Sequence, residues 1–372
     1  MIWAFFAVSV LASIWIWTMV WEYFVKRKIT IEVDVVRSTV DLGDHVVIQC
    51  RIINRSWFPC PNIRCTIQLP DQIDSGNTEH PNFSLFQTYL MPRQQTTVTL
   101  HVLGKKRGHG HLGKANFTLH DGLGLRRVFH STPIQAEVIV RPKRMQSIPV
   151  PLRMLDLMGE VRILRFFNED PSLLQGIRPY QDGDPLRYVS WYATARTQQL
   201  MVKEFGHTTT SRCLLVLSGD IQGDVQNRIL DILCERTIQL SEYLLGVGFS
   251  VGLYTNMFDS ILRDFYQRPS SAPEQLEKIR NRLGSLGEIP FVNLQNLLNV
   301  LPKLVSHGDM IIVLTGRLDN AVQVALSHLQ RFRGNLFVYA VLKPGEQINS
   351  RMNVQTFVEE APIIESTSKI GS

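Results

Sequence analysis

Three arginines lie close together in the segment 174–205, which also carries acidic and aromatic side chains. These arginines are Arg178, Arg187 and Arg196. A guanidinium can hold a carboxylate or a phosphate through two parallel hydrogen bonds, so the set could bind a phosphorylated or acidic ligand. The other interpretation is a structural clamp, in which the arginines pair with carboxylates of the chain itself and an Asp and a Tyr fix a turn. Because charged clusters usually have such structural roles, we favour the clamp.

The middle of this segment carries signals for the start of a helix. Asp184 is a typical N-cap residue, and Pro185 suits the first helical position because its missing N–H has no partner there anyway. Gly183, just before the cap, suits a turn with positive φ. Arg187 and Trp191 then lie four residues apart, close enough on a helix for a cation–π contact. We therefore expect a helix from Pro185, capped by Asp184, with Trp191 buried, so that alanine at position 184 or 191 lowers stability.

The order and spacing of these residues resemble the signature of a bacterial family, domain of unknown function 58 (DUF58). The positions that carry the resemblance are Arg178, Tyr180, Gly183, Asp184, Arg187, Val189, Trp191, Thr194, Ala195, Arg196, Leu200 and Glu204. The resemblance implies a membrane anchor, a β-rich region, the signature and then a domain similar to a von Willebrand factor A domain. It also implies an accessory or assembly role without catalysis, because family members are typically encoded beside MoxR-type AAA+ ATPases and transglutaminase-like membrane proteins.

An uncharged apolar run over residues 2–21 is long enough to cross a bilayer as a helix. A secretory signal peptide is the alternative, but no basic residues precede the run and no small-residue cleavage motif follows it. The basic triplet Lys26-Arg27-Lys28 comes next, and the positive-inside rule places the side after it in the cytoplasm. We predict a transmembrane helix over residues 1–25, a single span in the bacterial inner (cytoplasmic) membrane, with the soluble domains in the cytoplasm.

The net charge of +6 is concentrated near this helix. Residues 26–150 carry 17 Lys and Arg against 9 Asp and Glu. Basic clusters at 26–28, 105–107 and 141–144 fit attraction to anionic membrane lipids, although a solvated surface explains the last two equally well. Nucleic acid is a poor candidate partner, because the basic residues are not interleaved with aromatic ones as in a stacking platform.

Alternation of polar and apolar residues predicts an all-β, sandwich-like domain over residues 29–145. The stretch Gly108–Gly113 has the spacing of a nucleotide-binding loop, but the residues after it alternate like a strand. A hairpin is therefore expected there. His109 and His111 share one face of that stretch without a third ligand nearby in the sequence, so we expect no metal.

Residues 146–210 are interpreted as a connector that holds the signature, with a strand over 200–205. Strands and helices then alternate over 211–345, which predicts an α/β domain with a mostly parallel sheet. The order of these elements is similar to a von Willebrand A domain. Residues 346–372 are interpreted as a C-terminal tail. The whole chain is thus predicted to be multidomain.

The resemblance to a von Willebrand A domain also indicates where a divalent ion would be bound. The corresponding positions are Ser218, Asp220, Gln222 and Arg317. Only Asp220 offers a carboxylate, and Arg317 places a cation where a ligand belongs, whereas hard cations need several oxygen ligands. The site is degenerate, and we expect no tightly bound Mg²⁺ and no cofactor.

No residue set supports catalysis. The GxSxG pattern at 248–252 enters a strand after a helix, which is the wrong context for a nucleophile. Our leading hypothesis is therefore a non-enzymatic, membrane-anchored accessory or scaffold protein that docks a MoxR-type AAA+ ATPase and assists the assembly or maturation of protein complexes. The alternative is an anion- or phospho-ligand-binding module that uses the three signature arginines.

Overall fold

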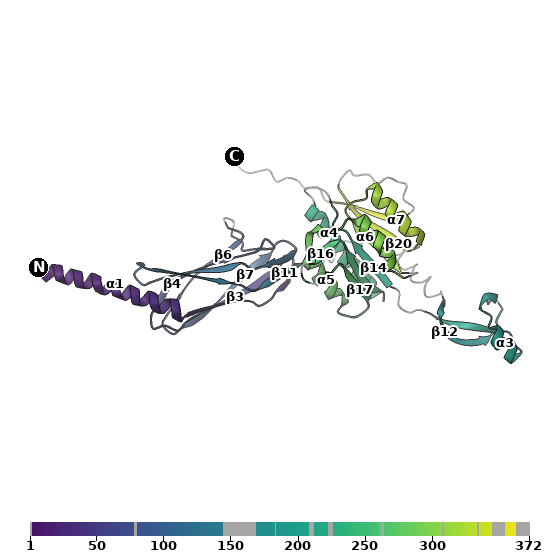
Figure 1. The fold of residues 1–372 in the computed structure, drawn as a ribbon, viewed down its shortest axis with the longest axis horizontal. Coiled ribbons are helices and arrows are strands. Elements are labelled where there is room, and N and C mark those ends of the chain that lie inside the picture. The colour runs from purple at the N-terminus through teal and green to yellow at the C-terminus, as the bar shows by residue number, and fades with distance from the viewer. Residues whose placement is uncertain are drawn as a thin grey trace. The chain divides into compact units, whose positions relative to one another are not determined.

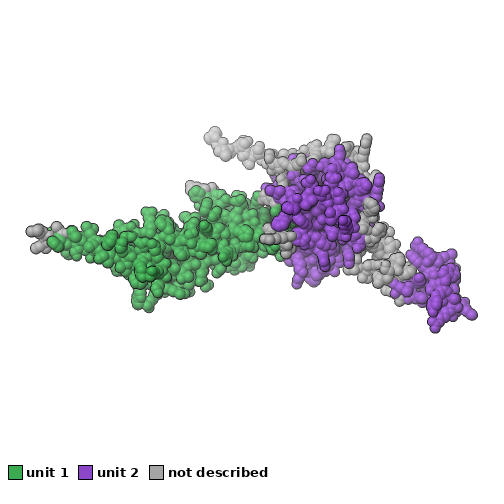
Figure 2. All heavy atoms as spheres, in the orientation of Figure 1, with its two compact units in different colours: residues 1–144, 259–262, 280–287 green, residues 145–258, 263–279, 288–372 purple. Residues whose placement is uncertain are grey.

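A computed structural model gives the fold of the chain in two compact units (Figure 2). The described residues are 2–77, 80–143, 169–182, 184–207, 212–221, 226–259, 261, 264–306, 309–332, 335–343 and 354–361. Unit 1 comprises residues 1–144, 259–262 and 280–287, and unit 2 comprises residues 145–258, 263–279 and 288–372. The first part of the predicted connector, residues 146–168, lies outside the described residues.

The chain begins with a long apolar helix, α1 (Ile2–Lys28), drawn in purple in Figure 1. Its residues Phe5–Lys28 are long and apolar enough to cross a membrane, which confirms the predicted apolar helix but not the crossing itself. Most of its apolar side chains are exposed, whereas Trp21 and Val25 near its end are buried in unit 1. The indole N–H of Trp21 donates a hydrogen bond to the Pro59 carbonyl at 2.9 Å. The end of the helix is thus attached to the domain that follows it.

Three β-sheets follow α1 within residues 29–141 of unit 1. Their strands are β1 (Ile29–Val35), β2 (Thr39–Asp41), β3 (His45–Asn54), β4 (Cys60–Gln68), β5 (Ile73–Asp74), β6 (Phe83–Leu90), β7 (Gln95–Gly104), β8 (Gly108–His111), β9 (Lys114–His120), β10 (Arg127–Pro133) and β11 (Glu137–Arg141). Two sheets have four strands, in the orders β1-β3-β7-β5 and β10-β9-β4-β6, and the third has the order β2-β11-β8. The β-rich domain expected from alternation is present.

Both four-stranded sheets contribute to one hydrophobic core. Ile48 and Ile52 come from β3, Ile63 and Ile67 from β4, and Phe117 from β9, and all five are buried. Within β3 and β4 the named residues are four positions apart, an even spacing that keeps them on one face because successive side chains point to opposite faces. The period of two seen in the sequence is therefore the pattern of strands that bury one face in a shared apolar interior.

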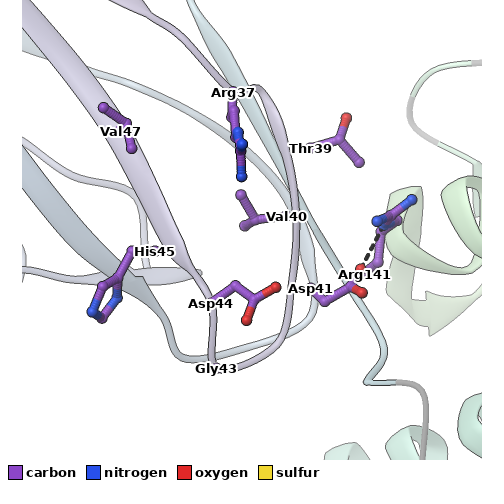
Figure 3. A pocket seen from close by; sticks show the side chains of 9 residues that line it. All are labelled: Arg37, Thr39, Val40, Asp41, Gly43, Asp44, His45, Val47 and Arg141. Atoms are coloured by element: carbon purple, nitrogen blue, oxygen red, sulfur yellow. Dashed lines mark hydrogen bonds and ion pairs between the residues drawn. The ribbon is translucent and has the colours of Figure 1, made fainter.

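A pocket of unit 1 opens beside β2 and β11, which run parallel (Figure 3). Its lining residues are Arg37, Thr39, Val40, Asp41, Gly43, Asp44, His45, Val47 and Arg141. The Asp41 carboxylate accepts a hydrogen bond from Nε of Arg141 at 2.7 Å. This ion pair joins β2 to β11, so we assign it a structural role.

The signature segment of unit 2 folds into a small module of its own. Its elements are β12 (Glu169–Pro179), the 3₁₀ turn η1 (Leu186–Tyr188), the helix α3 (Trp191–Thr197) and β13 (Met201–His207). The strand predicted over 200–205 is β13. Its antiparallel partner β12 was not expected, because the sequence there was interpreted as connector.

Beyond the signature, strands and helices alternate as predicted. The elements are β14 (Arg212–Leu217), α4 (Gln226–Gly246), β15 (Ser250–Thr255), β16 (Met257–Asp259), β17 (Tyr266–Ser270), α5 (Gln275–Ser285), β18 (Leu286–Pro290), α6 (Leu294–Val300), the 3₁₀ turn η2 (Leu301–Lys303), β19 (Met310–Thr315), α7 (Asn320–Phe332), β20 (Leu336–Leu342) and β21 (Gln355–Glu360). Six strands form one sheet in the order β17-β15-β14-β19-β20-β21. All its neighbours are parallel except the edge pair β15 and β17.

The central strands of this sheet are buried at every position except Arg212, the first residue of β14. Leu214, Val216 and Ile311 pack with residues of α6 and α7, while α4 contacts β14, β15, β19 and β20. Helices on both faces explain why these strands read as continuous apolar runs instead of alternating ones.

The strand β21 lies within residues 346–372, which the sequence analysis interpreted as a tail. It pairs in parallel with β20, and its Glu359 receives hydrogen bonds from Nε and Nη2 of Arg236 on α4, at 2.8 and 2.6 Å. The Tyr339 hydroxyl also donates to Glu359. Arg236 is buried, so this contact holds the edge strand against the helix and the neighbouring strand. The interpretation of this stretch as a tail was wrong because the strand is held in part by Arg236, 123 residues earlier in the chain.

The same contact sets the charge state of Glu359. Burial opposes ionisation, but the hydrogen bonds from Arg236 and Tyr339 outweigh it and hold the pKa of Glu359 below its usual value. A carboxylate with a depressed folded pKa contributes stability above the unfolded pKa, and that stability is lost as the pH falls through the folded pKa.

Glu359→Gln should destabilise the α/β sheet by about 3 kcal/mol at neutral pH, because the buried Arg236 guanidinium loses its counter-charge. The difference from wild type should shrink in acid, below the ordinary pKa of glutamate. Differential scanning calorimetry of the full chain measures both effects. Glu360→Gln, at the exposed neighbouring position, is the matched control, and equal losses in the two variants would contradict the role of the ion pair.

Candidate docking surface in the signature segment

The two strands of the signature module bring its ends together. Arg178 lies opposite Val202 and Pro179 opposite Met201 in the antiparallel pair of β12 and β13. The Tyr180 N–H donates to the Leu200 carbonyl at 2.8 Å, which closes the pair. The intervening residues 181–199 therefore form a long excursion between two paired strands.

An ion pair fixes the first turn of that excursion. Nη1 and Nη2 of Arg178 donate to the two carboxylate oxygens of Asp184 at 2.7 and 2.8 Å. The Gln181 N–H donates to the same carboxylate at 2.9 Å. The hydrogen bond from Arg178, followed by that from Gln181, holds the pKa of Asp184 below its usual value. Asp184 thus closes a turn, as the clamp interpretation expected, and Arg178 is its partner.

The prediction of a helix that starts at Pro185 and is capped by Asp184 was wrong in both respects. The chain makes only the 3₁₀ turn η1, after which Val189 adopts an extended conformation and forms a bridge with Val202. The helix α3 begins at Trp191, and its cap is Ser190, whose side-chain oxygen accepts from the Ala193 N–H at 3.4 Å. Pairing with β13 buries Val189 and Ser190, and this contact overrides the local signal of Asp-Pro.

This break also moves the aromatic residues. Trp191 is 70% exposed and Tyr192, next to it on α3, is 79% exposed, so the expectation of a buried Trp191 was wrong. The Arg187 guanidinium lies 4.8 Å from the ring centroid of Tyr188, and the expected contact with Trp191 is not the one formed. Arg187 and Trp191 do not share one helix, so the four-residue spacing has no structural meaning here.

The other predicted residues of the signature occupy different surroundings. Tyr180 is half-buried, Ala195 and Arg196 are exposed on α3, and Glu204 is exposed on β13. Gly183 lies outside the described residues. The structure therefore brings Arg178 and Asp184 together, whereas Arg196 lies on α3.

Several exposed residues of the module are large and apolar or are cationic. We refer to Leu186, Arg187, Trp191, Tyr192 and Arg196, all exposed, as the docking surface. Trp, Tyr and Arg are the residue types that dominate the energy of protein interfaces. Sequence reasoning missed Leu186 and Tyr192. Ser190, a good N-cap residue directly before Trp191, was the signal that could have placed Tyr192 on a helix.

The degenerate metal positions lie elsewhere in unit 2. Ser218 and Asp220 follow β14, and Arg317 follows β19. Nη1 of Arg317 lies 3.5 Å from Asp220, and its Nη2 lies 2.8 Å from Asp319. The guanidinium thus stands between two carboxylates that could otherwise serve an ion. Gln222 lies outside the described residues, and the absence of tight Mg²⁺ binding stays a prediction.

Residues 176–226 match the family model described as Protein of unknown function DUF58. The match covers the signature module from Gly176 onward and reaches the start of α4, and it supports the resemblance on which the sequence analysis rests. No curated protein matches the chain in sequence.

Several solved structures share a weak likeness with the chain. One is the CARDB domain of a Pyrococcus furiosus protein in complex with di-metal ions, at 12% identity, covering 28% of this chain and 90% of that one, with a TM-score of 0.19. A β-glucosidase from Erythrobacter marinus is 13% identical, with 28% and 15% covered and a TM-score of 0.17. The alkylpurine DNA glycosylase AlkC of Pseudomonas fluorescens is 12% identical, with 29% and 31% covered and a TM-score of 0.18. At these TM-scores the likeness carries no argument about fold or function.

Asp184→Asn should loosen the turn that begins the signature excursion, because a neutral amide cannot accept two charge-assisted hydrogen bonds from Arg178. Hydrogen exchange at the Gln181 amide should become about tenfold faster, as expected for the loss of one charge-assisted hydrogen bond. In wild type, this protection should persist below the ordinary pKa of aspartate and be lost only as the pH falls through the depressed folded pKa. Asp182→Asn, at an exposed position two residues away, should leave the exchange unchanged. Similar acceleration in both variants would refute the clamp.

Proposed function

We propose that this chain is a non-enzymatic, membrane-anchored accessory protein that docks a partner through its signature module. The observation that carries the proposal is the exposure of Trp191 and Tyr192 on a short helix whose base is fixed by paired strands. Large aromatic side chains are costly to leave in water, and burying them against a partner stabilises a complex. The adjacent Arg187 and Arg196 suit a partner surface with acidic groups.

In this proposal, α1 is the membrane anchor. Its exposed apolar side chains would face lipid, and the triplet Lys26-Arg27-Lys28 at its end would lie on the cytoplasmic side. Units 1 and 2 would then be cytoplasmic, at a bacterial inner membrane, with basic residues near anionic lipids. We take the α/β part of unit 2 to be similar to a von Willebrand A domain, because a largely parallel sheet is covered by helices and begins with an early antiparallel edge pair.

The partner in this proposal is a MoxR-type AAA+ ATPase, acting with a transglutaminase-like membrane protein in the assembly or maturation of protein complexes. This choice rests on the resemblance to DUF58 alone. An exposed aromatic and cationic patch on a small module is a suitable contact for such an enzyme, since hot spots of this composition are the usual centre of protein interfaces.

The alternative, an anion- or phospho-ligand site built from three arginines, has less support. Arg178 already holds Asp184 through two hydrogen bonds, so its guanidinium is committed to the chain itself. Only Arg187 and Arg196 would remain for a ligand, and Arg187 also lies over the Tyr188 ring. A docking surface uses Arg187 and Arg196 together with the aromatic residues and leaves the pair of Arg178 and Asp184 intact.

Trp191→Ser should abolish recovery of the ATPase without changing the stability of the protein. The full chain is purified from native membranes in detergent after crosslinking, and the recovered proteins are identified by mass spectrometry. Phe129→Ser is the matched control, because Phe129 is an equally exposed aromatic residue on β10. Recovery of an AAA+ ATPase with wild type and the control, and its loss with Trp191→Ser, supports docking. Equal recovery with both variants, or no ATPase with wild type, would refute it.

A further inference from the structure

Two histidines and a glutamate of unit 1 are brought together by strand pairing. In the antiparallel register of β8 and β11, His111 lies opposite Glu137 and His109 lies opposite Ile139. Side chains two residues apart on a strand share a face, so His109 and His111 point to the same side, and Glu137 lies beside both. The third ligand that the sequence did not reveal is therefore supplied by a different strand.

The spacing of the three side chains fits a bound metal ion. Nε2 of His109 lies 3.1 Å from one oxygen of Glu137, and Nδ1 of His111 lies 3.5 Å from the other. One ligand atom from each residue lies within 4.8 Å of the others. In a tetrahedral zinc site with bonds of about 2.0–2.1 Å, neighbouring ligand atoms are roughly 3.3 Å apart. The two distances from histidine to Glu137 are thus close to those that one small ion requires.

The ligand types select the kind of ion. Two imidazoles and one carboxylate suit Zn²⁺ and similar divalent transition metals, whereas Ca²⁺ and Mg²⁺ prefer oxygen ligands throughout. The His109 side chain is 7% exposed and the His111 side chain 69% exposed, so one ligand is held in place while the site stays open to solvent. We propose that His109, His111 and Glu137 form a Zn²⁺-type site with a fourth position open to water.

Calorimetric titration of the full, metal-stripped chain in detergent tests this site, with Zn²⁺ as the probe and an affinity tag that contains no histidine. We expect one Zn²⁺ per chain with a dissociation constant in the micromolar range, roughly that of an open site with three protein ligands. His111→Ala and Glu137→Gln should each weaken binding at least about tenfold, since loss of one ligand is worth a power of ten or more. Both positions are exposed, so the variants should fold.

His101→Ala is the matched control. His101 and His45 form a second pair of neighbouring imidazoles in unit 1, with ring centroids 6.5 Å apart. The control should bind Zn²⁺ like wild type, and Co²⁺ bound to either protein should give the intense visible absorption of a tetrahedral site. No saturable binding by wild type, or equal binding by wild type and Glu137→Gln, would overturn the proposal and leave the three residues as an ordinary hydrogen-bonded cluster.

A second, independent observation concerns the end of unit 1 at which α1 enters. We define the anchor-end loops as residues 55–59, 91–94 and 121–126. Strand register places them together, since Ile29 lies opposite Asn54, Ile53 opposite Gln95, and Arg127 opposite His120. The Arg55 N–H donates to the Lys28 carbonyl, and the Arg93 N–H donates to the Ser56 carbonyl. The loop 55–59 is therefore bonded both to the end of the apolar helix and to the loop 91–94.

Contacts with α1 fix the depth of these loops. The Trp17 and Phe58 rings meet edge to face with centroids 5.2 Å apart. Trp21 donates to the Pro59 carbonyl, and Arg126 pairs with Glu22 at 2.7 Å. Trp17 and Trp21 belong to the last turns of the apolar run, where a spanning helix passes from hydrocarbon into the headgroup region. The loops are thus held at the level of the bilayer surface if α1 spans the membrane.

The loops have the composition of a membrane-surface contact. Trp57, Met91, Leu123 and Leu125 are exposed at their tips. The Arg93 guanidinium lies 3.6 Å from the ring centroid of Trp57, which pairs a cation with an interfacial aromatic residue. We propose that the anchor-end loops insert into the headgroup boundary of an anionic bilayer and fix the orientation of unit 1. This inference rests on the proposed anchoring by α1.

Fluorescence quenching in vesicles of phosphatidylethanolamine and phosphatidylglycerol tests the insertion. Single cysteines are introduced into the full chain as Leu125→Cys, Leu103→Cys and Val10→Cys, and each is labelled with an environment-sensitive dye. The native cysteines are buried and free, so labelling is expected at the introduced position. Leu103, near the opposite end of β7, is the matched control, and Val10 reports on α1 itself.

Lipids that carry a nitroxide on the acyl chain should quench the dye at position 125 several-fold more strongly than at position 103. Equal, weak quenching at 125 and 103 together with strong quenching at position 10 would overturn the insertion and leave the anchor intact. Weak quenching at all three positions would overturn the anchor itself, and with it this inference.

Discussion

The bidentate ion pair between Arg178 and Asp184 holds together the segment on which the proposed docking surface is built. Its two hydrogen bonds, with a third from the Gln181 amide, close the turn that leads from β12 into the excursion. A closed turn lets Val189 reach Val202, and this bridge in turn sets where α3 can begin. Trp191 and Tyr192, at the start of that helix, are exposed.

A similar ion pair between an arginine and a carboxylate joins the last strand to the α/β sheet. Arg236 of α4 binds Glu359 of β21, and Tyr339 of the neighbouring strand donates to the same carboxylate. A buried guanidinium needs a carboxylate close by, since an uncompensated charge is costly away from water. In both places the guanidinium of an arginine is hydrogen-bonded to one carboxylate. The pair fixes a segment of backbone that has few apolar contacts of its own. These arginines are then not available to a ligand.

Unit 1 combines an apolar helix with a β-domain whose hydrogen bonds reach the helix end. Because Trp21 and Val25 are buried in the β-domain, the end of the helix is packed against that domain. A force or a tilt imposed on the helix would be transmitted to the β-domain. Such coupling suits an accessory protein whose β-domain is held at a membrane, as the proposal requires.

The sequence alone determined the elements whose periodicity is strong: the apolar helix α1, the alternating strands of unit 1 and the parallel strands after the signature. Each is set by side chains close together in the chain, and burial of one face or of both leaves a period that can be read directly. Tertiary structure decided what depends on distant partners. Pairing with Val202 moved the helix start from Pro185 to Trp191, the register of β8 with β11 brought Glu137 to two histidines, and Arg236 drew β21 into the sheet. Local signals cannot specify these outcomes, because the free energy that selects them comes from contacts between segments far apart in the sequence.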